Sequence, residues 1–323
     1  MTGYLARRVL AAIPLLIGVL TLVFLLLEMV PGDPFGGEPE AGRSREASLR
    51  LRQVMGVDRP IAARYLDWLR GFLTGDLGVS LLFRRSVLEL LVEGAANTLI
   101  LSGTALLLQF LLGTAAGIAT VWDESRRTDR IMTPLASLIY SVPSFWLGLA
   151  LVWLFSVRLG WLPVSQMRDL DAASLGFMAR LGDLLRHLTL PCLALTLPSA
   201  AGIALLVREE MRASLGRGFI RAARARGVGR RSILLRHSLS TCLLSLVTLL
   251  GLALPGLLAG SAVLEVLFAW PGVGRLAYQA VLGRDGPLVL GCTWAGALMV
   301  VGGSLMADLL AALVDPRVKE NLP

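Results

Sequence analysis

The chain has 323 residues, of which 55% are hydrophobic and only 17% are charged, and its formal net charge is +8. Because soluble domains carry about 25% charged residues, this composition excludes an ordinary cytosolic enzyme and indicates an integral membrane protein. The basic excess is typical of the cytoplasmic loops of membrane proteins, so we do not expect a nucleic-acid partner.

Six uncharged runs predict six transmembrane helices, because a helix needs about 20 residues to cross the hydrocarbon core. The runs are 9–27, 94–122, 131–157, 188–207, 238–264 and 286–307. The first run is longer than the apolar core of a signal peptide, and no small-residue cleavage site precedes Glu28, so we predict that this helix is retained. The predicted fold class is therefore an all-α integral membrane protein.

Counts of arginine and lysine in the short loops predict that both termini lie in the cytoplasm. The short loops on that side hold 16 such residues against 6 on the other side. The long segment 31–93 is left out, because long loops cross the membrane largely regardless of charge.

The predicted spans divide the chain into four parts: 1–30 with the cytoplasmic N-terminus and helix 1, 31–95 outside, 96–315 as the membrane core with helices 2–6, and 316–323 as a cytoplasmic tail. Within the outside part, apolar spacing at 61–73 and 87–92 predicts short helices along the outer membrane surface. The stretch 38–45 is polar and glycine-rich, which predicts a flexible connection.

The cytoplasmic loop 208–239 is the most basic part of the chain and holds nine arginines. Within it, 218–227 combines small residues with arginine at helical spacing, which predicts a short amphipathic helix that Gly227 ends in the left-handed conformation. Such a helix could fit the groove of another protein, or it could rest on anionic lipid as a basic anchor. The residues concerned are Arg217, Arg221, Ala222, Ala223, Arg224 and Gly227.

Arg221-Ala222-Ala223, followed after three residues by Gly227, resembles the EAA loop of ATP-binding cassette (ABC) importer permeases of the oligopeptide, dipeptide and nickel family. Arg221 stands where the motif has glutamate, a form similar to that of the peptide branch. Other stretches similar to this family follow the same order along the chain, at 30–34, 75–80, 141–146, 158–163, 268–274 and 313–317. The chain departs from the family pattern at 93–98, Ser240, Thr241, Ser245 and Gly286.

This resemblance implies the type I ABC importer permease fold, with loop 208–239 coupling the chain to an ATPase. The chain would form half of a translocation pathway for di- and oligopeptides, in the cytoplasmic (inner) membrane of a bacterium or archaeon. The implied partners are a second homologous permease subunit, two ABC ATPase subunits, an extracytoplasmic solute-binding protein and membrane lipid. ATP and Mg²⁺ would bind the ATPase subunits, so this chain is expected to hold no cofactor and to be no enzyme.

The lysine content independently supports the expectation that another chain binds ATP. The single lysine, Lys319, is followed by glutamate, whereas a Walker A loop needs lysine followed by serine or threonine. The two histidines, His187 and His237, and three widely spaced cysteines do not predict a metal site either.

Polar residues and a proline in or beside the predicted spans are candidates for the translocation pathway, because ionisable groups in spans are usually functional and proline breaks occur at transport pathways. They are Gln109, Pro143, Glu265 and Asp308. Asp308 could instead pair with a cytoplasmic arginine, and Pro143 could mark an ordinary packed kink. The alternatives to a peptide permease are a same-family permease for nickel or a metal chelate, a membrane enzyme, and an ATP-independent transporter.

Overall fold

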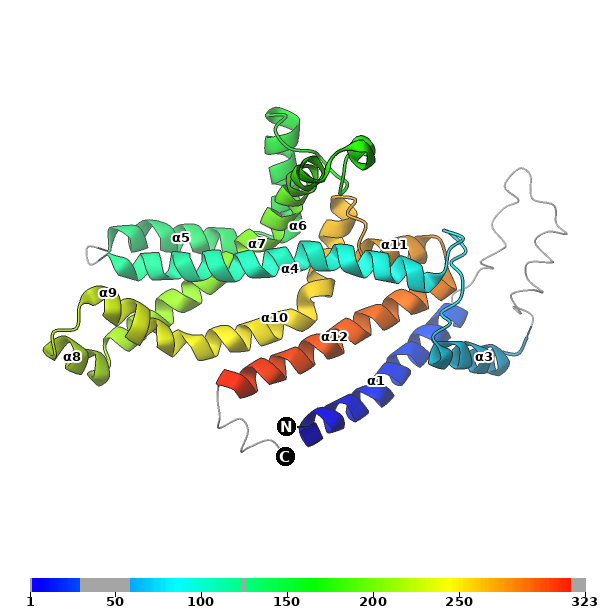
Figure 1. The fold of residues 1–323 in the computed structure, drawn as a ribbon, viewed down its shortest axis with the longest axis horizontal. Coiled ribbons are helices and arrows are strands. Elements are labelled where there is room, and N and C mark those ends of the chain that lie inside the picture. The colour runs from blue at the N-terminus through cyan, green and yellow to red at the C-terminus, as the bar shows by residue number, and fades with distance from the viewer. Residues whose placement is uncertain (1, 30–58, 124–125, 315–323) are drawn as a thin grey trace.

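The computed structural model describes residues 2–29, 59–123 and 126–314, which form helices and no β-sheet. The long helices run lengthwise through the molecule, with α8 and α9 at one end and α3 and α11 at the other (Figure 1). The α-helices are α1 (Thr2–Met29), α3 (Ile61–Thr74), α4 (Val87–Trp122), α5 (Arg127–Ser141), α6 (Ser144–Leu151), α7 (Phe177–Leu215), α8 (Gly218–Ala225), α9 (Arg230–Ser232), α10 (Leu239–Leu267), α11 (Val273–Leu282) and α12 (Gly286–Val314). Two π-helices, η1 (Val152–Arg158) and η3 (Ile233–Ser238), and one 3₁₀-helix, η2 (Leu170–Ser174), complete the described part.

Five of these helical segments are long and apolar enough to cross a membrane, and a sixth crossing follows if α5 and α6–η1 form one broken span. That pair bends by 102°, so the third predicted span, 131–157, is broken near its middle. The residue before a proline disfavours the helical conformation, and Val142 accordingly takes an extended conformation with ψ 126° before Pro143. The kink predicted at Pro143 is therefore confirmed.

Of the two short helices predicted in the outside part, one is present and the other is not. The stretch 61–73 is a separate helix, α3, as expected. The stretch 87–92 is not a separate helix, because its residues form the first turns of α4, which continues to Trp122 without a break. The stretches 30–34 and 38–45 and the tail 316–323 lie outside the described residues.

The motif at 75–80 has a structural role. Ser80 Oγ donates a hydrogen bond to Asp285 Oδ2 at 2.5 Å, across 205 positions of sequence. The same fully buried carboxyl group accepts from the backbone N–H of Leu82 and, through Oδ1, from that of Leu288 at the start of α12. Because a carboxyl group at a helix N-terminus satisfies free N–H groups, this contact fixes the segment before α4 against α12.

Helices α4 and α7 approach each other closely at two glycines of α4. A Cβ atom added to Gly113 would lie 2.7 Å from Ile203, and one added to Gly117 would lie 2.7 Å from Val207. Glycines four residues apart are typical of close helix contacts in membranes, where packing rather than water exclusion drives association. The Gly113–Gly117 spacing therefore sets how near the two helices lie.

We expect Gly117→Leu to lower the free energy of unfolding by about 1–3 kcal/mol or more, the usual cost of overpacking. The matched control is Gly103→Leu in the same helix, where an added Cβ meets nothing within 4 Å. The melting temperature of the chain in detergent extracts of whole cells measures the difference. Equal melting temperatures for the two variants would contradict the close α4–α7 contact.

Candidate coupling site and pathway residues

The amphipathic helix predicted in the basic loop is present as α8, which lies at the end of the molecule opposite α3 and α11 (Figure 1). Its N-cap is Arg217, in an extended conformation after the end of α7. Three arginines on the predicted basic face are all exposed: Arg217, Arg221 and Arg224. The helix therefore presents a positively charged surface at one tip of the molecule.

Another side of α8, next to the arginines, packs against the chain itself. Ile220 is fully buried and Ala223 is 1% exposed, whereas Ala222 is exposed. The two alanines of the motif therefore differ in this subunit, with Ala223 in its interior and Ala222 at its surface. The Ala223 methyl group fills space inside this subunit, and Ala222 is the small residue that a partner can reach.

The end of α8 is a Schellman motif, the arrangement in which two N–H groups close onto the last helical turn. The Gly227 N–H donates to Arg224 O at 2.9 Å, and the Val228 N–H donates to Ala223 O at 3.2 Å. Gly227 has φ +78°, so the predicted left-handed stop is confirmed. An added Cβ there would meet nothing within 4 Å, which means that backbone conformation alone favours glycine at this position.

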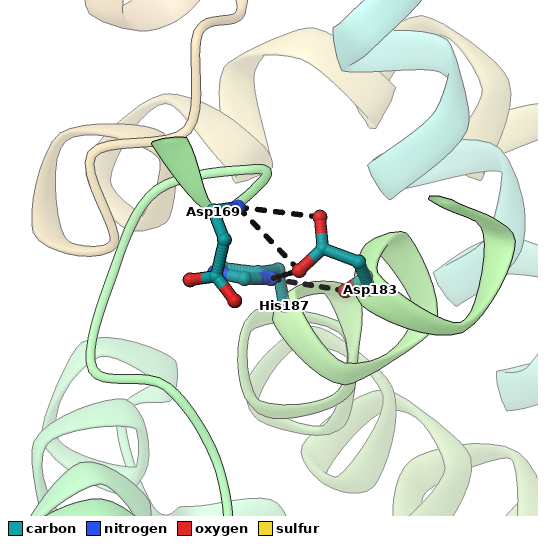
Figure 2. Close-up of side chains that lie close together, drawn as sticks. All are labelled: Asp169, Asp183 and His187. Carbon is teal, nitrogen blue, oxygen red and sulfur yellow. Dashed lines mark hydrogen bonds and ion pairs between the residues drawn. The ribbon is translucent and has the colours of Figure 1, made fainter. Parts of the chain in front are cut away.

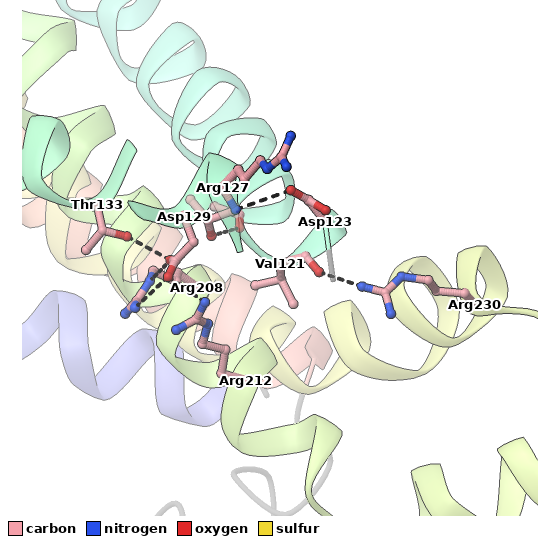
Figure 3. Close-up of polar contacts among 10 residues, drawn as sticks. Val121, Asp123, Arg127, Asp129, Thr133, Arg208, Arg212 and Arg230 are labelled. Carbon is pink, nitrogen blue, oxygen red and sulfur yellow. Dashed lines mark hydrogen bonds and ion pairs between the residues drawn. The ribbon is translucent and has the colours of Figure 1, made fainter. Parts of the chain in front are cut away.

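The segment after α8 is attached to the end of a long membrane helix. The Arg230 guanidinium donates from Nη2 to Trp122 O at 3.0 Å and to Val121 O at 3.2 Å (Figure 3). These carbonyls belong to the last turn of α4, where no helical N–H remains to satisfy them and where a cation interacts favourably with the helix dipole. Arg230 therefore attaches the segment after α8 to the end of α4.

A buried carboxylate links α5 to the end of α7 that precedes α8. Asp129 is 7% exposed, and it forms ion pairs with Arg208 and with Arg212, the latter at 2.6 Å, while Thr133 donates to it at 2.9 Å (Figure 3). A buried charge is tolerated when it is paired and hydrogen-bonded. The sequence analysis missed this acid, although an aspartate in the loop 123–130, on the same predicted side as the arginine-rich segment, was a usable signal.

Glu265 lies in a buried junction of α4, α10 and α11. It has no exposed surface, and its Oε1 accepts hydrogen bonds from Thr98 Oγ1 at 2.8 Å and Ser261 Oγ at 2.9 Å. Its Oε2 accepts the N–H of Arg275, in the first turn of α11, at 3.1 Å. All three donors belong to this chain, so the placement favours a structural role for Glu265 over contact with a solute.

The motif at 268–274 has the small residues that this junction needs. A Cβ added to Gly272 would lie 2.4 Å from the carboxyl carbon of Glu265. The neighbouring Trp270 is fully buried and its Nε1 donates to Asn97 O at 2.8 Å. These contacts explain the motif by packing alone, without a transported solute.

The other three pathway candidates lie on separate elements. Gln109 is half-buried on α4, Asp308 is half-buried on α12, and Pro143 is exposed at the N-cap of α6. Within the described part of the chain, no hydrogen bond joins any two of these candidates. The expectation of Asp308 pairing with a cytoplasmic arginine stays untested.

Comparison with known proteins assigns the chain to a family. A family model described as the binding-protein-dependent transport system inner membrane component matches residues 109–320, and a model for the N-terminal part of such components matches residues 1–93. The chain belongs to this family. The EAA loop is characteristic of it, and the multi-pass helical architecture described above is that of a membrane component.

Individual relatives of this inner membrane component match over its whole length. The oligopeptide transport system permease protein AppB of Bacillus subtilis is 32% identical over 99% of this chain and 100% of the relative. The dipeptide transport system permease protein DppB of Alkalihalophilus pseudofirmus is 32% identical over 99% and 100%, respectively. The structure also superposes on one chain of the MetNI methionine ABC transporter with a TM-score of 0.48 at 18% identity, a likeness too distant to support the assignment.

Proposed function

We propose that this chain is the permease subunit of an ATP-driven importer for di- or oligopeptides, and that α8 transmits the state of an ATPase subunit to the membrane helices. The single observation that carries the coupling role is α8 itself. It has an exposed arginine face and a glycine stop, and it is anchored to this subunit by the buried Ile220 and Ala223. The names of the relatives, which refer to oligopeptides and dipeptides, support the choice of solute.

The proposed transmission runs from α8 into two membrane helices. Arg230 connects the segment after α8 to the last turn of α4, and Ser214 Oγ and Ser238 Oγ, 2.6 Å apart in the interior, connect the end of α7 to η3. Coupling requires that ATP binding favours one of two arrangements of packed elements. Because these contacts hold the segments on both sides of α8 against the long helices, movement of α8 is passed on to them.

The proposed assembly has a second homologous permease, two ABC ATPase subunits that bind ATP and Mg²⁺, and an extracytoplasmic solute-binding protein. The ATPase groove that receives α8 is expected to be acidic, because every charged residue of 217–231 is an arginine. This chain supplies the pathway and the coupling surface, and the chemistry of ATP hydrolysis belongs to the ATPase.

Ala222→Trp tests the coupling surface, since this alanine is exposed on α8. We expect the bulky side chain to prevent close approach of the ATPase and to reduce its co-purification at least about tenfold, the effect of losing roughly 1.4 kcal/mol of binding. Ala222→Ser is the matched control and should keep the ATPase bound. If the Ala222→Trp variant binds the ATPase normally and shows normal peptide-stimulated hydrolysis, the coupling role is contradicted. The loop is then better explained as a basic anchor on lipid.

The proposed topology places both termini and α8 in the cytoplasm and segment 31–93 outside. The three native cysteines are buried, so a single introduced cysteine reports its own side. We expect a membrane-impermeant thiol reagent to label Ser44→Cys in intact cells and Ala225→Cys only after permeabilisation. The reverse pattern would overturn the orientation.

A further inference from the structure

The structure brings together three residues of the 165–187 region that the sequence did not connect. His187 and Asp183 lie one turn apart on α7, and Asp169 approaches them from the loop before η2 (Figure 2). One oxygen or nitrogen atom from each of the three lies within 4.8 Å of the others. His187 is 6% exposed and Asp183 is 7% exposed, whereas the Asp169 side chain is 70% exposed and opens the group to solvent.

The hydrogen bonds of His187 define which ring nitrogen is available. Nδ1 lies 2.9 Å from Asp183 O and 3.1 Å from Asp183 Oδ1. A neutral imidazole with its proton on Nδ1 satisfies this geometry and leaves a lone pair on Nε2. Within the described residues, no hydrogen bond reaches Nε2, although the ring is almost completely buried.

A carboxylate oxygen of Asp169 lies near Nε2, at a distance suited to a shared metal ion. Nε2 lies 3.6 Å from Asp169 Oδ1, which is too long for a hydrogen bond. Two ligands bound to one tetrahedral zinc ion at about 2.1 Å each are separated by about 3.4 Å. The two atoms therefore stand nearly as far apart as two ligands of one ion.

The surroundings complete the arrangement that metal-binding histidines usually have. A histidine ligand commonly donates its second N–H to a carboxylate or carbonyl, which fixes the ring, and Asp183 offers both groups to Nδ1. The Asp183 carboxylate also accepts the backbone N–H of Asp169 at 3.2 Å, which positions that residue. In the described part of the chain, no arginine or lysine forms an ion pair with either aspartate.

We propose that His187 Nε2 and the Asp169 carboxylate bind a divalent transition-metal ion of the zinc class, with Asp183 as the positioning residue and water completing the coordination. Nitrogen together with carboxylate suits Zn²⁺ better than Mg²⁺ or Ca²⁺. The ion would fasten the loop to α7 beside the turn after α10, because the Gln166 N–H donates to Phe268 O at 2.7 Å and Met167 packs with the buried Trp270. This revises the expectation, drawn from histidine count alone, that the chain has no metal site.

The test uses the intact importer, purified through a tag without histidine, treated with a chelator and then titrated with ZnCl₂ against a chromophoric competitor. All proteins carry His237→Gln, which removes the other histidine of this chain. We expect the parent to bind one more Zn²⁺ ion tightly, per copy of this chain, than the His187→Asn or the Asp169→Asn variant. Asp183→Asn should weaken binding about 10–100-fold, as losses of such supporting groups do.

Asp171→Asn is the matched control, since Asp171 is an exposed acid two positions from Asp169, and it should bind Zn²⁺ like the parent. Zn²⁺ should also raise the melting temperature of the parent and of the control, but not that of Asp169→Asn. Equal Zn²⁺ binding by the parent and Asp169→Asn would overturn the proposal. So would equal binding by the parent and His187→Asn, which would leave the cluster as an ion-pair network only.

Discussion

Gly227→Val is expected to leave the permease inserted and folded while abolishing coupling of ATP hydrolysis to peptide uptake. Gly227 has φ +78° and open space around its missing Cβ, so a valine there is opposed by backbone strain and not by a clash. That strain amounts to about 1–2 kcal/mol for a residue with a side chain and is larger for β-branched residues. Relief of the strain would unwind the last turn of α8 and redirect the chain toward Arg230.

The matched control is Gly229→Val, two positions further along the chain. Gly229 also has open space for a Cβ, but its φ of −64° and ψ of 149° suit any residue. The measurement is peptide-stimulated ATP hydrolysis together with uptake in reconstituted membranes. If both variants couple normally, or if both lose coupling equally, the left-handed stop at Gly227 has no special part in transmission.

Glu265→Ala is expected to destabilise the subunit strongly, because it leaves two buried hydroxyl groups and a helix N-terminal N–H without their acceptor. Hydrogen bonds to a carboxyl group contribute about 1.5–3 kcal/mol each when ionised and about 1 kcal/mol otherwise. A total loss of about 2–4 kcal/mol follows, after partial replacement by the remaining partners. The observable results are a lower melting temperature and less subunit in the membrane.

Two comparisons separate this structural role from the pathway role that the sequence suggested for Glu265. Thr98→Val removes one donor of the same junction without touching the carboxyl group, and it should lower the melting temperature by a smaller amount. Glu265→Gln keeps the shape of the side chain, so uptake per folded subunit should be unchanged for peptides of different charge. A change in peptide preference at unchanged stability would instead place Glu265 on the pathway.

Much of the fold could be predicted from the sequence because hydropathy is a local property. Each apolar run of about 20 residues has one low-energy solution in lipid, a helix that satisfies its own backbone, and the runs at 9–27 and 286–307 became α1 and α12. Helix ends were less predictable, since both α4 and α7 continue beyond the apolar run on at least one side. Outside the hydrocarbon core, packing against the rest of the chain stabilises helix that hydropathy does not detect.

Two features of the coupling helix α8 were predictable for a similar reason, because they depend only on neighbouring residues. Arginine spacing and Gly227 determine the exposed face and the left-handed stop within ten residues of sequence. Which alanine faces a partner was not predictable, because Ala222 and Ala223 are identical in sequence terms. Their difference arises because α8 lies against the π-helix η3 and the end of α7, and Ala223 becomes buried there with Ile220.

The sequence by itself determined the membrane class, the number of apolar spans, and the position and stop of α8, all of which depend on residues close together in the chain. Only the tertiary structure determined the hydrogen-bond partners of Glu265 and Asp285, because Thr98 and Ser80 lie 167 and 205 positions away. It also determined which arginines pair with Asp129 and that Asp169 lies close to His187. Such contacts depend on how the helices cross and turn in space. The 102° bend at Pro143, for example, changes the direction of the chain segment that leads to Asp169.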